Sequence, residues 1–562
     1  MERVSAARLR VLFLILALLS TSVAGKTVYW QALKRPELLA QAIDQVRTDQ
    51  VLAAQRGVIR DRTGAILATT VPLRSLYAIP AQIPENERAR VSVALGTLLG
   101  RDPLAIRARL DGGAEWLFIH RRLPEETARA IEDMHLPGIG FQAEPKRLYP
   151  NDTTAAHVLG FVNDDGDGQY GVEGAYDTLL RGTPGRLMVE RDPANRALAI
   201  GVREAQPAIR GSDLTLTLDL GIQAAAEREL RLALEKEKAP GGSIVVLDPR
   251  DGAILAMASA PTFDPAGVGV ADLESLRDRA VSWSYEPGST MKALTIAAAI
   301  DQRVVAPTTS YNDVGYAIIG GRRLNNALGR AYGPTTVTQV LERSLNAGAV
   351  FVASKLGAQK LYDYIGAFGL GRPTGVDLAG EVAGQVRPLA EWYPVDVGTA
   401  AFGQGLTVTP LQLAAAYAAI ANGGTLYRPY IVASRRDAEG EHRTAPVAVR
   451  RVIGPETAAT LRTMLTSTID NGIAANARLS SFSAAGKTGT AQIPDAAGSY
   501  ESDEYISSFA GFAPAQDPRF VTVIVIERPQ SRLLGTLSAM AAFRGLALDA
   551  LRYERVQPDR RP

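Results

Sequence analysis

Five short strand-like runs in the C-terminal half of the chain limit its possible folds more than any other feature of the sequence. The first two runs flank the turn residues 248–252 (Asp-Pro-Arg-Asp-Gly), which predicts a hairpin. A helix-rich stretch follows to about Asn422, and a helical pattern at 535–553 comes after the last run. The five predicted strands are 242–247, 253–260, 482–492, 506–513 and 520–527. Their order predicts one antiparallel sheet of about five strands that is covered by helices.

At 562 residues the chain is too long for one hydrophobic core, so we expect several domains. The unit with the five strands is predicted to span 212–556 and to include a helix at 220–237. Residues 32–211 mix short helical and extended patterns, which is typical of an interaction or spacer module. A disordered tail is expected at 557–562. The predicted fold class is α+β with several domains.

The N-terminus has the pattern of a membrane segment. Three arginines within the first ten residues precede an uncharged run at 11–25, and an aromatic pair follows. We predict a cytoplasmic tail at 1–10, a transmembrane anchor at 11–31 and an amphipathic helical stalk at 36–50. The small residues at 22–24 also fit a cleaved signal peptide, and that alternative stays open. In both cases the positive charges place the bulk of the chain outside the cytoplasm.

The composition excludes several kinds of chemistry. The chain has no cysteine, which excludes disulfides, thiolate metal sites and a cysteine nucleophile. Its formal net charge is only +2 and no basic stripe occurs, so we expect no nucleic-acid partner. Of the four histidines only His442 lies in the C-terminal unit, in a polar stretch that is expected to be a surface loop. We expect neither a metal ion nor a cofactor.

Lysine is rare in this chain and yet recurs in its candidate catalytic motifs. Only nine of the 61 basic residues are lysines, and Lys292 and Lys487 both fall inside such motifs. Burial and neighbouring charge can make a lysine neutral, whereas an arginine stays charged. A site that needs a proton acceptor at neutral pH would therefore have to keep lysine.

The first candidate motif is Ser289-x-x-Lys292. Pro287 and Gly288 predict a helix start, and positions three apart share a helix face. First-turn amides favour a developing oxyanion, and a neutral Lys292 could act as the general base that takes the proton of Ser289, the nucleophile. On its own, such a pattern more often marks a helix-capping serine beside a solvated lysine.

The second candidate motif is Ser344-Leu345-Asn346, which follows the helical pattern at 337–343. Ala347 and Gly348 suggest a helix break, and a turn there could aim two side chains into a cleft. Ser344 would relay a proton toward a leaving amine, and Asn346 would hydrogen-bond a substrate amide. A helix cap is the alternative, because this tripeptide is common.

The third candidate motif, Lys487-Thr488-Gly489-Thr490, lies in a predicted strand. Gly489 would let a substrate backbone approach the edge of the sheet, and Lys487 would offer charge. Thr488 and Thr490 offer hydroxyls to a terminal carboxylate. The backbone amide of Thr490 would be the second oxyanion donor beside that of Ser289.

The three motifs in this order resemble the signatures of the penicillin-binding protein and serine β-lactamase superfamily. Further likeness to class B penicillin-binding proteins lies in 56–59 (Arg-Gly-Val-Ile), 147–150 (Arg-Leu-Tyr-Pro), 171–174 (Gly-Val-Glu-Gly) and 403–405 (Gly-Gln-Gly). The resemblance implies an elongated mixed α/β pedestal of the dimerisation type at 32–211, with a head insertion at about 83–137. A penicillin-binding transpeptidase domain follows at 212–556. Residues 160–164 look more like division-type than elongation-type members.

The resemblance also implies an activity, a location and partners. The protein would be a monofunctional peptidoglycan D,D-transpeptidase that cross-links stem peptides through an acyl-enzyme on Ser289, which β-lactams would acylate. It would sit in the bacterial inner membrane as a single-pass protein, anchored by residues 11–31, with its catalytic domain on the extracytoplasmic side. Its membrane partner would be a glycosyltransferase of the shape, elongation, division and sporulation family. A D,D-carboxypeptidase, a β-lactamase, and a β-lactam sensor or scaffold without turnover remain as alternatives.

Overall fold

The computed structural model describes residues 2–38, 47–190, 203–493 and 504–560. The chain divides into two compact units, each of which is built from two separate segments. Unit 1 consists of Met1–Gln55 and Gly182–Gly211, and unit 2 of Arg56–Arg181 and Ser212–Pro562. The second segment of unit 1 therefore interrupts unit 2 in the sequence.

Unit 1 begins with a long apolar helix, α1 (Glu2–Val28), which continues as the π-helical segment η1 (Tyr29–Leu33). Within Ala6–Leu33, an 18-residue window has a mean hydropathy of 2.0, and none of this window is buried. Among the residues that the structure describes, Ala6–Leu33 is the one helix long and apolar enough to cross a membrane. By length and composition it fits the anchor predicted at 11–31.

Unit 1 also contains a three-stranded antiparallel sheet. Its strands, in hydrogen-bonded order, are β1 (Arg47–Leu52), β10 (Gly185–Glu190) and β11 (Arg203–Gln206). Because β1 pairs Gln50 with Leu187, the helix predicted over 36–50 is wrong at its C-terminal end. Residues 39–46 of that prediction lie outside the described residues. Strand formation depends on a distant partner, which the local pattern does not contain.

Two parts of the chain that are far apart in sequence form one six-stranded sheet in unit 2. Its strands, in hydrogen-bonded order, are β21 (Gly440–Arg443), β20 (Val432–Asp437), β12 (Asp213–Leu216), β2 (Ile59–Arg60), β3 (Ile66–Val71) and β7 (Lys146–Leu148). The central pair β12 and β2 is parallel, with Leu214 opposite Ile59. This sheet joins the N-terminal part of unit 2 to its C-terminal part.

A buried ionic network lies where three of the N-terminal motifs converge. Arg56 Nε and Arg147 Nε each donate to a different oxygen of Glu173, both at 2.7 Å. Arg56 also binds Asp177 at 2.7 Å, and Arg147 donates to the carbonyl of Gly57 at 2.7 Å. Glu173 is fully buried, so its charge is balanced by two guanidinium groups instead of water.

A smaller group of elements between Arg74 and Ala143 has a hydrophobic core of its own. Its elements are β4 (Arg74–Ala78), η2 (Pro80–Gln82), α3 (Arg88–Leu99), α4 (Pro103–Asp111), β5 (Leu117–Leu123), α5 (Glu125–Glu132) and β6 (Ile139–Ala143). The strands form a sheet in the order β5-β4-β6. The group is wider than the insertion expected at about 83–137, because both outer strands pair with β4.

The predicted five-stranded antiparallel sheet is confirmed. Its strands, in hydrogen-bonded order, are β14 (Ile254–Ala260), β13 (Gly241–Leu247), β25 (Phe520–Glu527), β24 (Tyr505–Ala513) and β23 (Ala485–Gln492). Both faces of this sheet are buried, which explains the largely apolar sequences of β13, β14 and β25. Ile244 and Val246 belong to one core, and Val245 and Leu247 belong to the other.

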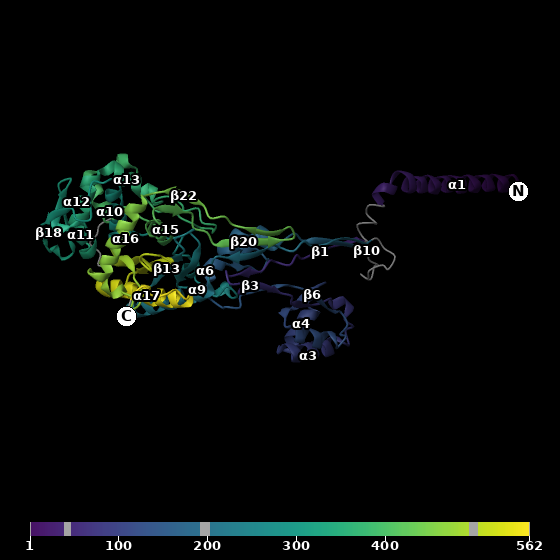
Figure 1. Ribbon diagram of the computed structural model, residues 1–562. Helices are drawn as coiled ribbons and strands as arrows, with labels where there is room; N and C mark the ends of the chain where they lie inside the picture. Colours follow the sequence, from purple (N-terminus) through teal and green to yellow (C-terminus); the bar gives the residue numbers. More distant parts are fainter. Residues whose placement is uncertain (1, 39–46, 191–202, 494–503, 561–562) are drawn as a thin grey trace. The chain divides into compact units, whose positions relative to one another are not determined.

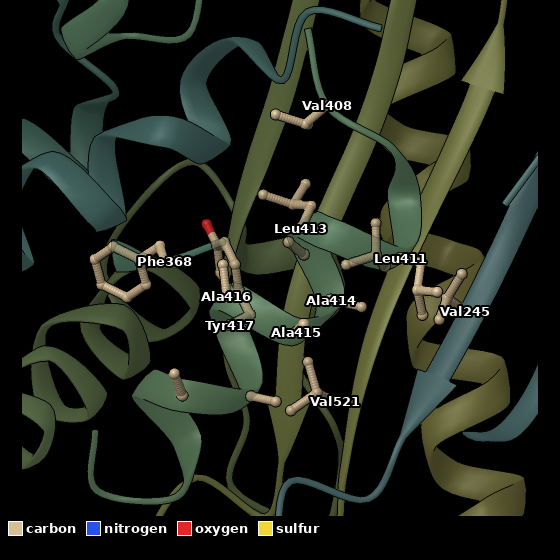
Figure 2. Packing of buried hydrophobic residues seen from close by; sticks show 14 of the residues in the cluster. Val245, Phe368, Val408, Leu411, Leu413, Ala414, Ala415, Ala416, Tyr417 and Val521 are labelled. Atoms are coloured by element: carbon tan, nitrogen blue, oxygen red, sulfur yellow. The ribbon is translucent and has the colours of Figure 1, made fainter. Parts of the chain in front are cut away.

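Helices cover both faces of the sheet. On one face α9 (Leu220–Glu237) and α17 (Arg532–Tyr553) lie side by side (Figure 1). On the other face lies α15 (Pro410–Ala421), an alanine-rich helix whose residues are all buried. Figure 2 shows α15 against the sheet, with Val245 and Val521 beside it. The small alanine side chains let the helix pack closely on the strands.

The other described elements of unit 2 complete the layers around this core. The remaining helices are α6 (Ala156–Leu159), α7 (Gly171–Ala175), α8 (Asp177–Arg181), η3 (Val268–Val270), η4 (Leu273–Leu276), η5 (Gly288–Thr290), α10 (Met291–Asp301), η6 (Ala327–Gly329), α11 (Val337–Arg343), α12 (Asn346–Leu356), α13 (Ala358–Ala367), η7 (Leu389–Glu391), α14 (Pro394–Ala401), α16 (Pro455–Asp470) and η8 (Ala475–Ala477). The remaining strands form pairs: β8 (Phe161–Val162) with β9 (Gly168–Gln169), β15 (Ser310–Asp313) with β18 (Gly333–Thr336), β16 (Tyr316–Ile319) with β17 (Arg322–Asn325), and β19 (Thr425–Tyr427) with β22 (Ala448–Arg451).

The C-terminal end is more ordered than its sequence suggests. Asp559 accepts a hydrogen bond from the backbone nitrogen of Ser483 at 2.6 Å, and Arg560 pairs with Asp470 at 2.7 Å. The disordered tail expected at 557–562 is therefore wrong for these two residues. Specific polar contacts hold a stretch whose composition alone predicts disorder.

Candidate active site

The predicted helix start at Ser289 is confirmed, with a short 3-10 turn (η5) leading into α10. Gly288 has a φ of 55°, and a Cβ there would lie 2.7 Å from the carbonyl oxygen of Thr490. The backbone nitrogen of Gly288 donates to the carbonyl of Gly403 at 3.0 Å. On the core side, the Tyr417 hydroxyl of α15 donates to the carbonyl of Thr290 at 2.8 Å. The turn that carries Ser289 is thus held between the edge strand β23 and the buried helix α15.

Lys292 is fully buried and is surrounded by oxygen atoms. Its Nζ lies 2.9 Å from Ser289 Oγ, 2.7 Å from the carbonyl oxygen of Ser344 and 2.8 Å from Asn346 Oδ1. Asn346 Nδ2 donates to the carbonyl of Asn325 at 3.0 Å, which fixes the orientation of the amide. The carbonyl and amide oxygens can only accept. A neutral amine therefore gives its two protons to them and directs its lone pair at the hydroxyl of Ser289.

The surroundings of Lys292 favour this neutral form. Burial holds the pKa of Lys292 well below its usual range, and the positive charges of Lys487 and Arg532 lower it further. Burial also lowers the pKa of Lys487, to about 7. The predicted role of Lys487 as a source of positive charge therefore depends on its protonation state.

Ser344 connects the two lysines. Its Oγ lies 2.9 Å from Lys487 Nζ and 3.2 Å from Lys292 Nζ. The second and third motifs, which are far apart in sequence, therefore meet at one hydroxyl. This arrangement allows a proton to pass between either amine and a group bound beside Ser344.

The backbone of Ser344 is unusual. Its φ is 57°, in the left-handed region that a non-glycine residue adopts at a cost of roughly 1–3 kcal/mol. The predicted turn between two helices is confirmed, but it lies at Ser344 and Leu345, between α11 and α12, and not at Ala347 and Gly348. Gly348 lies inside α12, where a Cβ would come within 2.3 Å of Val340 Cγ2. Close packing of α12, not a turn, explains this glycine.

Gly489 has a reason beyond the predicted one. A Cβ at this position would lie 2.2 Å from Ser508 Oγ and 2.9 Å from Thr290 Cγ2. The missing side chain therefore lets β23 approach β24 and the turn of Ser289, which is a second reason for a glycine here beside the predicted approach of a substrate. β23 is the outermost strand of its sheet, so a substrate strand can still pair with its free edge.

The two threonines of the third motif differ in their surroundings. Thr488 is nearly buried, and its Oγ1 lies 3.4 Å from Lys487 Nζ. Thr490 Oγ1 lies 3.2 Å from Thr536 Oγ1 in the first turn of α17. Sequence reasoning missed Thr536 and Arg532, and it also missed Asn325, because no motif marks these residues and only the fold brings them to the site.

His442 does not belong to this site. It lies on the exposed strand β21, not in a loop as predicted, and its Nε2 is 3.2 Å from Asp437 Oδ1. Asp437, Glu439 and His442 place ligand atoms within 4.8 Å of one another. These groups are partly or fully exposed, and we assign them no metal.

Comparison with known proteins gives the same picture for the whole chain. A model of the penicillin-binding protein transpeptidase domain matches residues 242–546, and a model of the penicillin-binding protein dimerisation domain matches residues 51–216. Stage V sporulation protein D of Bacillus subtilis is 34% identical over 543 residues, which cover 95% of this chain and 84% of the relative. Peptidoglycan D,D-transpeptidase FtsI of Escherichia coli is 32% identical over 543 residues, which cover 95% and 89%.

Solved structures are similar over most of their length. Penicillin-binding protein 2X from Streptococcus thermophilus superimposes with a TM-score of 0.78 at 25% identity, covering 90% of this chain and 80% of that one. Penicillin-binding protein 3 from Mycobacterium tuberculosis, in complex with aztreonam, gives a TM-score of 0.70 at 29% identity, covering 91% and 98%.

Proposed function

The chain belongs to the class B penicillin-binding proteins, and from that premise we propose how its residues carry out peptidoglycan D,D-transpeptidation. The protein is a serine-type D-Ala-D-Ala transpeptidase of cell-wall synthesis, and β-lactams are its inhibitors. One observation carries the assignment of residues: Lys292 Nζ is fully buried and lies 2.9 Å from Ser289 Oγ. A hydroxyl next to a buried, unprotonated amine is an activated nucleophile.

In the acylation step, Lys292 takes the proton of Ser289 while Ser289 Oγ bonds to the carbonyl carbon of the penultimate D-Ala. The carbonyl oxygen gains negative charge, and the backbone amides of Ser289 and Thr490 stabilise it. Lys292 becomes an ammonium ion in this step. The low dielectric of the site lowers the pKa of that ammonium ion, so it gives up its proton easily in the next step.

Collapse of the tetrahedral intermediate breaks the bond to the terminal D-Ala, whose nitrogen must gain a proton. Ser344 Oγ lies 3.2 Å from Lys292 Nζ and can relay it. Ser344 gives its own proton to the leaving nitrogen and receives one from Lys292. Free D-Ala leaves, Lys292 is neutral again, and Ser289 carries the acyl group.

The acceptor amine of a neighbouring stem resolves the acyl-enzyme by the same path in reverse. Its nitrogen attacks the ester carbonyl and loses a proton through Ser344 to Lys292. Lys292 returns a proton to Ser289 Oγ as the ester bond breaks, which leaves the cross-linked product. Lys487 orients Ser344 from 2.9 Å.

The remaining motif residues bind the substrate in this proposal. The donor peptide extends along the free edge of β23 at Thr488, Gly489 and Thr490, where the threonine hydroxyls face its terminal carboxylate. Asn346 positions Lys292 through its Oδ1 and retains a second N–H for a substrate amide.

Labelled penicillin followed by peptide mapping tests the nucleophile. The adduct is expected on Ser289, and Ser289→Ala should abolish both labelling and cross-linking. An adduct on another residue would overturn the assignment. Product analysis separates the alternatives: cross-linked dimer indicates a transpeptidase, free tetrapeptide a carboxypeptidase, and labelling without turnover a sensor or scaffold.

We further propose the arrangement of the chain around this activity. Residues 1–10 are the cytoplasmic tail, 11–31 cross the inner membrane, 32–211 form the pedestal, and 212–556 form the transpeptidase domain on the extracytoplasmic side. The exposed apolar helix Ala6–Leu33 supports the anchor. Its partner is a membrane glycosyltransferase of the shape, elongation, division and sporulation family, in a division-type complex. Membrane fractionation of the full chain and of a chain without residues 1–31 tests the anchor, since only the full chain should sediment with membranes.

A further inference from the structure

The first turn of α17 is connected to the edge strand that carries the third motif. Thr536 Oγ1 donates to the carbonyl of Arg532 at 3.0 Å and lies 3.2 Å from Thr490 Oγ1. Because the proton of Thr536 is already used, the hydroxyl of Thr490 is the donor in the second bond. In this state Thr490 can donate to a substrate carboxylate only by giving up its bond to Thr536, so a further donor beside Thr490 would strengthen the recognition of the anion.

Arg532 is placed to supply that donor. It is the first residue of α17, its side chain is exposed, and its guanidinium lies 5.6 Å from the ring centroid of Tyr505. Tyr505 is paired with Gln492 at the end of β23, two residues beyond Thr490. The guanidinium therefore lies at the rim of the site, at the end of the strand that is proposed to bind the donor peptide.

Among the residues that the structure describes, Arg532 forms no ion pair, unlike its neighbour Arg528. In the same connection between β25 and α17, Arg528 pairs with Glu504 and Glu527, both at 3.0 Å. The start of a helix disfavours a cation. The charge of Arg532 also acts on Lys292, whose pKa it lowers. An anion bound at this rim would relieve the repulsion among these positive groups.

We propose that Arg532 is a specificity-determining residue that binds a carboxylate of the substrate beside Thr490. The guanidinium fork matches a carboxylate with two parallel hydrogen bonds. The inference rests on the proposed function, since the carboxylate belongs to a stem-peptide donor. Two sources offer this group: the C-terminal carboxylate of D-Ala-D-Ala, which β-lactams also carry, and a side-chain carboxylate on the third stem residue.

The test compares Arg532→Gln with wild type, as full chains in detergent. Acylation rates are measured with benzylpenicillin and with its methyl ester at pH 9, since Arg532→Gln also changes the pKa of Lys292 and a higher pH favours the neutral amine in both proteins. D-Ala release is measured with pentapeptides that have or lack a carboxylate on the third side chain. Arg528→Gln is the matched control, because its charge is already paired, and its rates should equal those of wild type.

If the C-terminal carboxylate is the ligand, Arg532→Gln should lower the rate of acylation by benzylpenicillin about 10-fold, because a hydrogen bond to a charged group is lost. The rate of acylation by the methyl ester should stay unchanged. If the third stem residue supplies the carboxylate, Arg532→Gln should slow D-Ala release by the same factor, and only from the pentapeptide that has the extra carboxylate. Arg532→Lys should recover part of either loss. Equal rates for Arg532→Gln and wild type on all substrates, or equal slowing of penicillin and its ester, would overturn the inference. Failure of wild type to acylate Ser289 would instead overturn the proposed function.

Discussion

Lys487 Nζ lies 2.9 Å from Ser344 Oγ, and this contact brings the third motif into one hydrogen-bonded chain with the second. Ser344 Oγ is also 3.2 Å from Lys292 Nζ, so the two buried amines share one hydroxyl. Two cations so close together and away from water would repel each other strongly. The site therefore favours states in which at least one lysine is neutral, in line with the lowered pKa of both Lys292 and Lys487.

Lys292→Arg should abolish acylation, because a guanidinium stays charged and cannot take the proton of Ser289. Loss of a general base typically costs about 100- to 10,000-fold in rate. Stopped-flow measurement of acylation by fluorescent penicillin gives this loss of rate. Lys360→Arg, at an exposed position of α13, is the control and should react like wild type. Acylation by Lys292→Arg at the wild-type rate would exclude Lys292 as the base.

The pH dependence of acylation should reveal the coupling between the two lysines. Both pKa values are lowered, so the charged forms appear only as the pH falls, and acylation should fall with them as Lys292 gains its proton. The wild-type profile should show two macroscopic steps that belong to the pair.

Lys487 variants separate the two steps. Lys487→Gln removes a positive charge, which raises the pKa of Lys292. The acid limb, which is the fall of the acylation rate with decreasing pH, should therefore move to higher pH and become a single step. Lys487→Arg keeps the charge, so the limb should not move to higher pH and acylation should be weakened without being lost. An unshifted acid limb in Lys487→Gln would contradict the coupling, and complete loss in Lys487→Arg would show that more than charge matters.

Local patterns predicted much of the transpeptidase domain. The strand patterns of the five segments and the spacing of Ser289 and Lys292 are properties of short segments, and the structure agrees with both. The pairing of β12 with β2 and the order of the strands bring distant segments together. The sequence alone contains no local signal for such pairings, as the misassigned helix at 47–50 also shows.

The sequence motifs predicted which residues form the site better than they predicted the conformation, the pKa or the neighbours of those residues. Ser344 was recognised as a motif residue, but its left-handed conformation depends on how α11 and α12 pack. The pKa of Lys487, about 7, results from burial, which a motif does not report. Arg532 and Thr536 carry no motif at all, since only the folding of α17 against the sheet brings them beside Thr490.

Glu173→Gln should destabilise the N-terminal part of unit 2. Glu173 binds Arg56 and Arg147 at 2.7 Å each, and all three side chains are buried. The substitution leaves two buried guanidinium groups without their main counter-charge, at a cost of about 3–5 kcal/mol. Glu125→Gln, which affects an exposed pair with Arg129, should cost less than about 1 kcal/mol. Denaturant unfolding followed by tryptophan fluorescence compares them, and equal unfolding midpoints would contradict the role given to the network.

Gly489→Ala should impair acylation although it adds only one methyl group. The new Cβ would lie 2.2 Å from Ser508 Oγ, 2.9 Å from Thr290 Cγ2 and 3.0 Å from the carbonyl oxygen of Pro287. β23 must therefore move away from β24 or from the turn of Ser289, and a displacement of about 1 Å near a reacting group costs on the order of 100-fold in rate.

A second variant and a control make this prediction specific. Ser508→Ala in the Gly489→Ala background removes the shortest contact and leaves those to Thr290 and Pro287, so it should restore only part of the rate. Gly366→Ala, in α13 with nothing within 4 Å of the added Cβ, should acylate like wild type. The measurement is the rate of acylation by fluorescent penicillin, compared among the folded variants and wild type. A wild-type rate in Gly489→Ala would mean that the approach of β23 to Ser289 is not needed for the reaction.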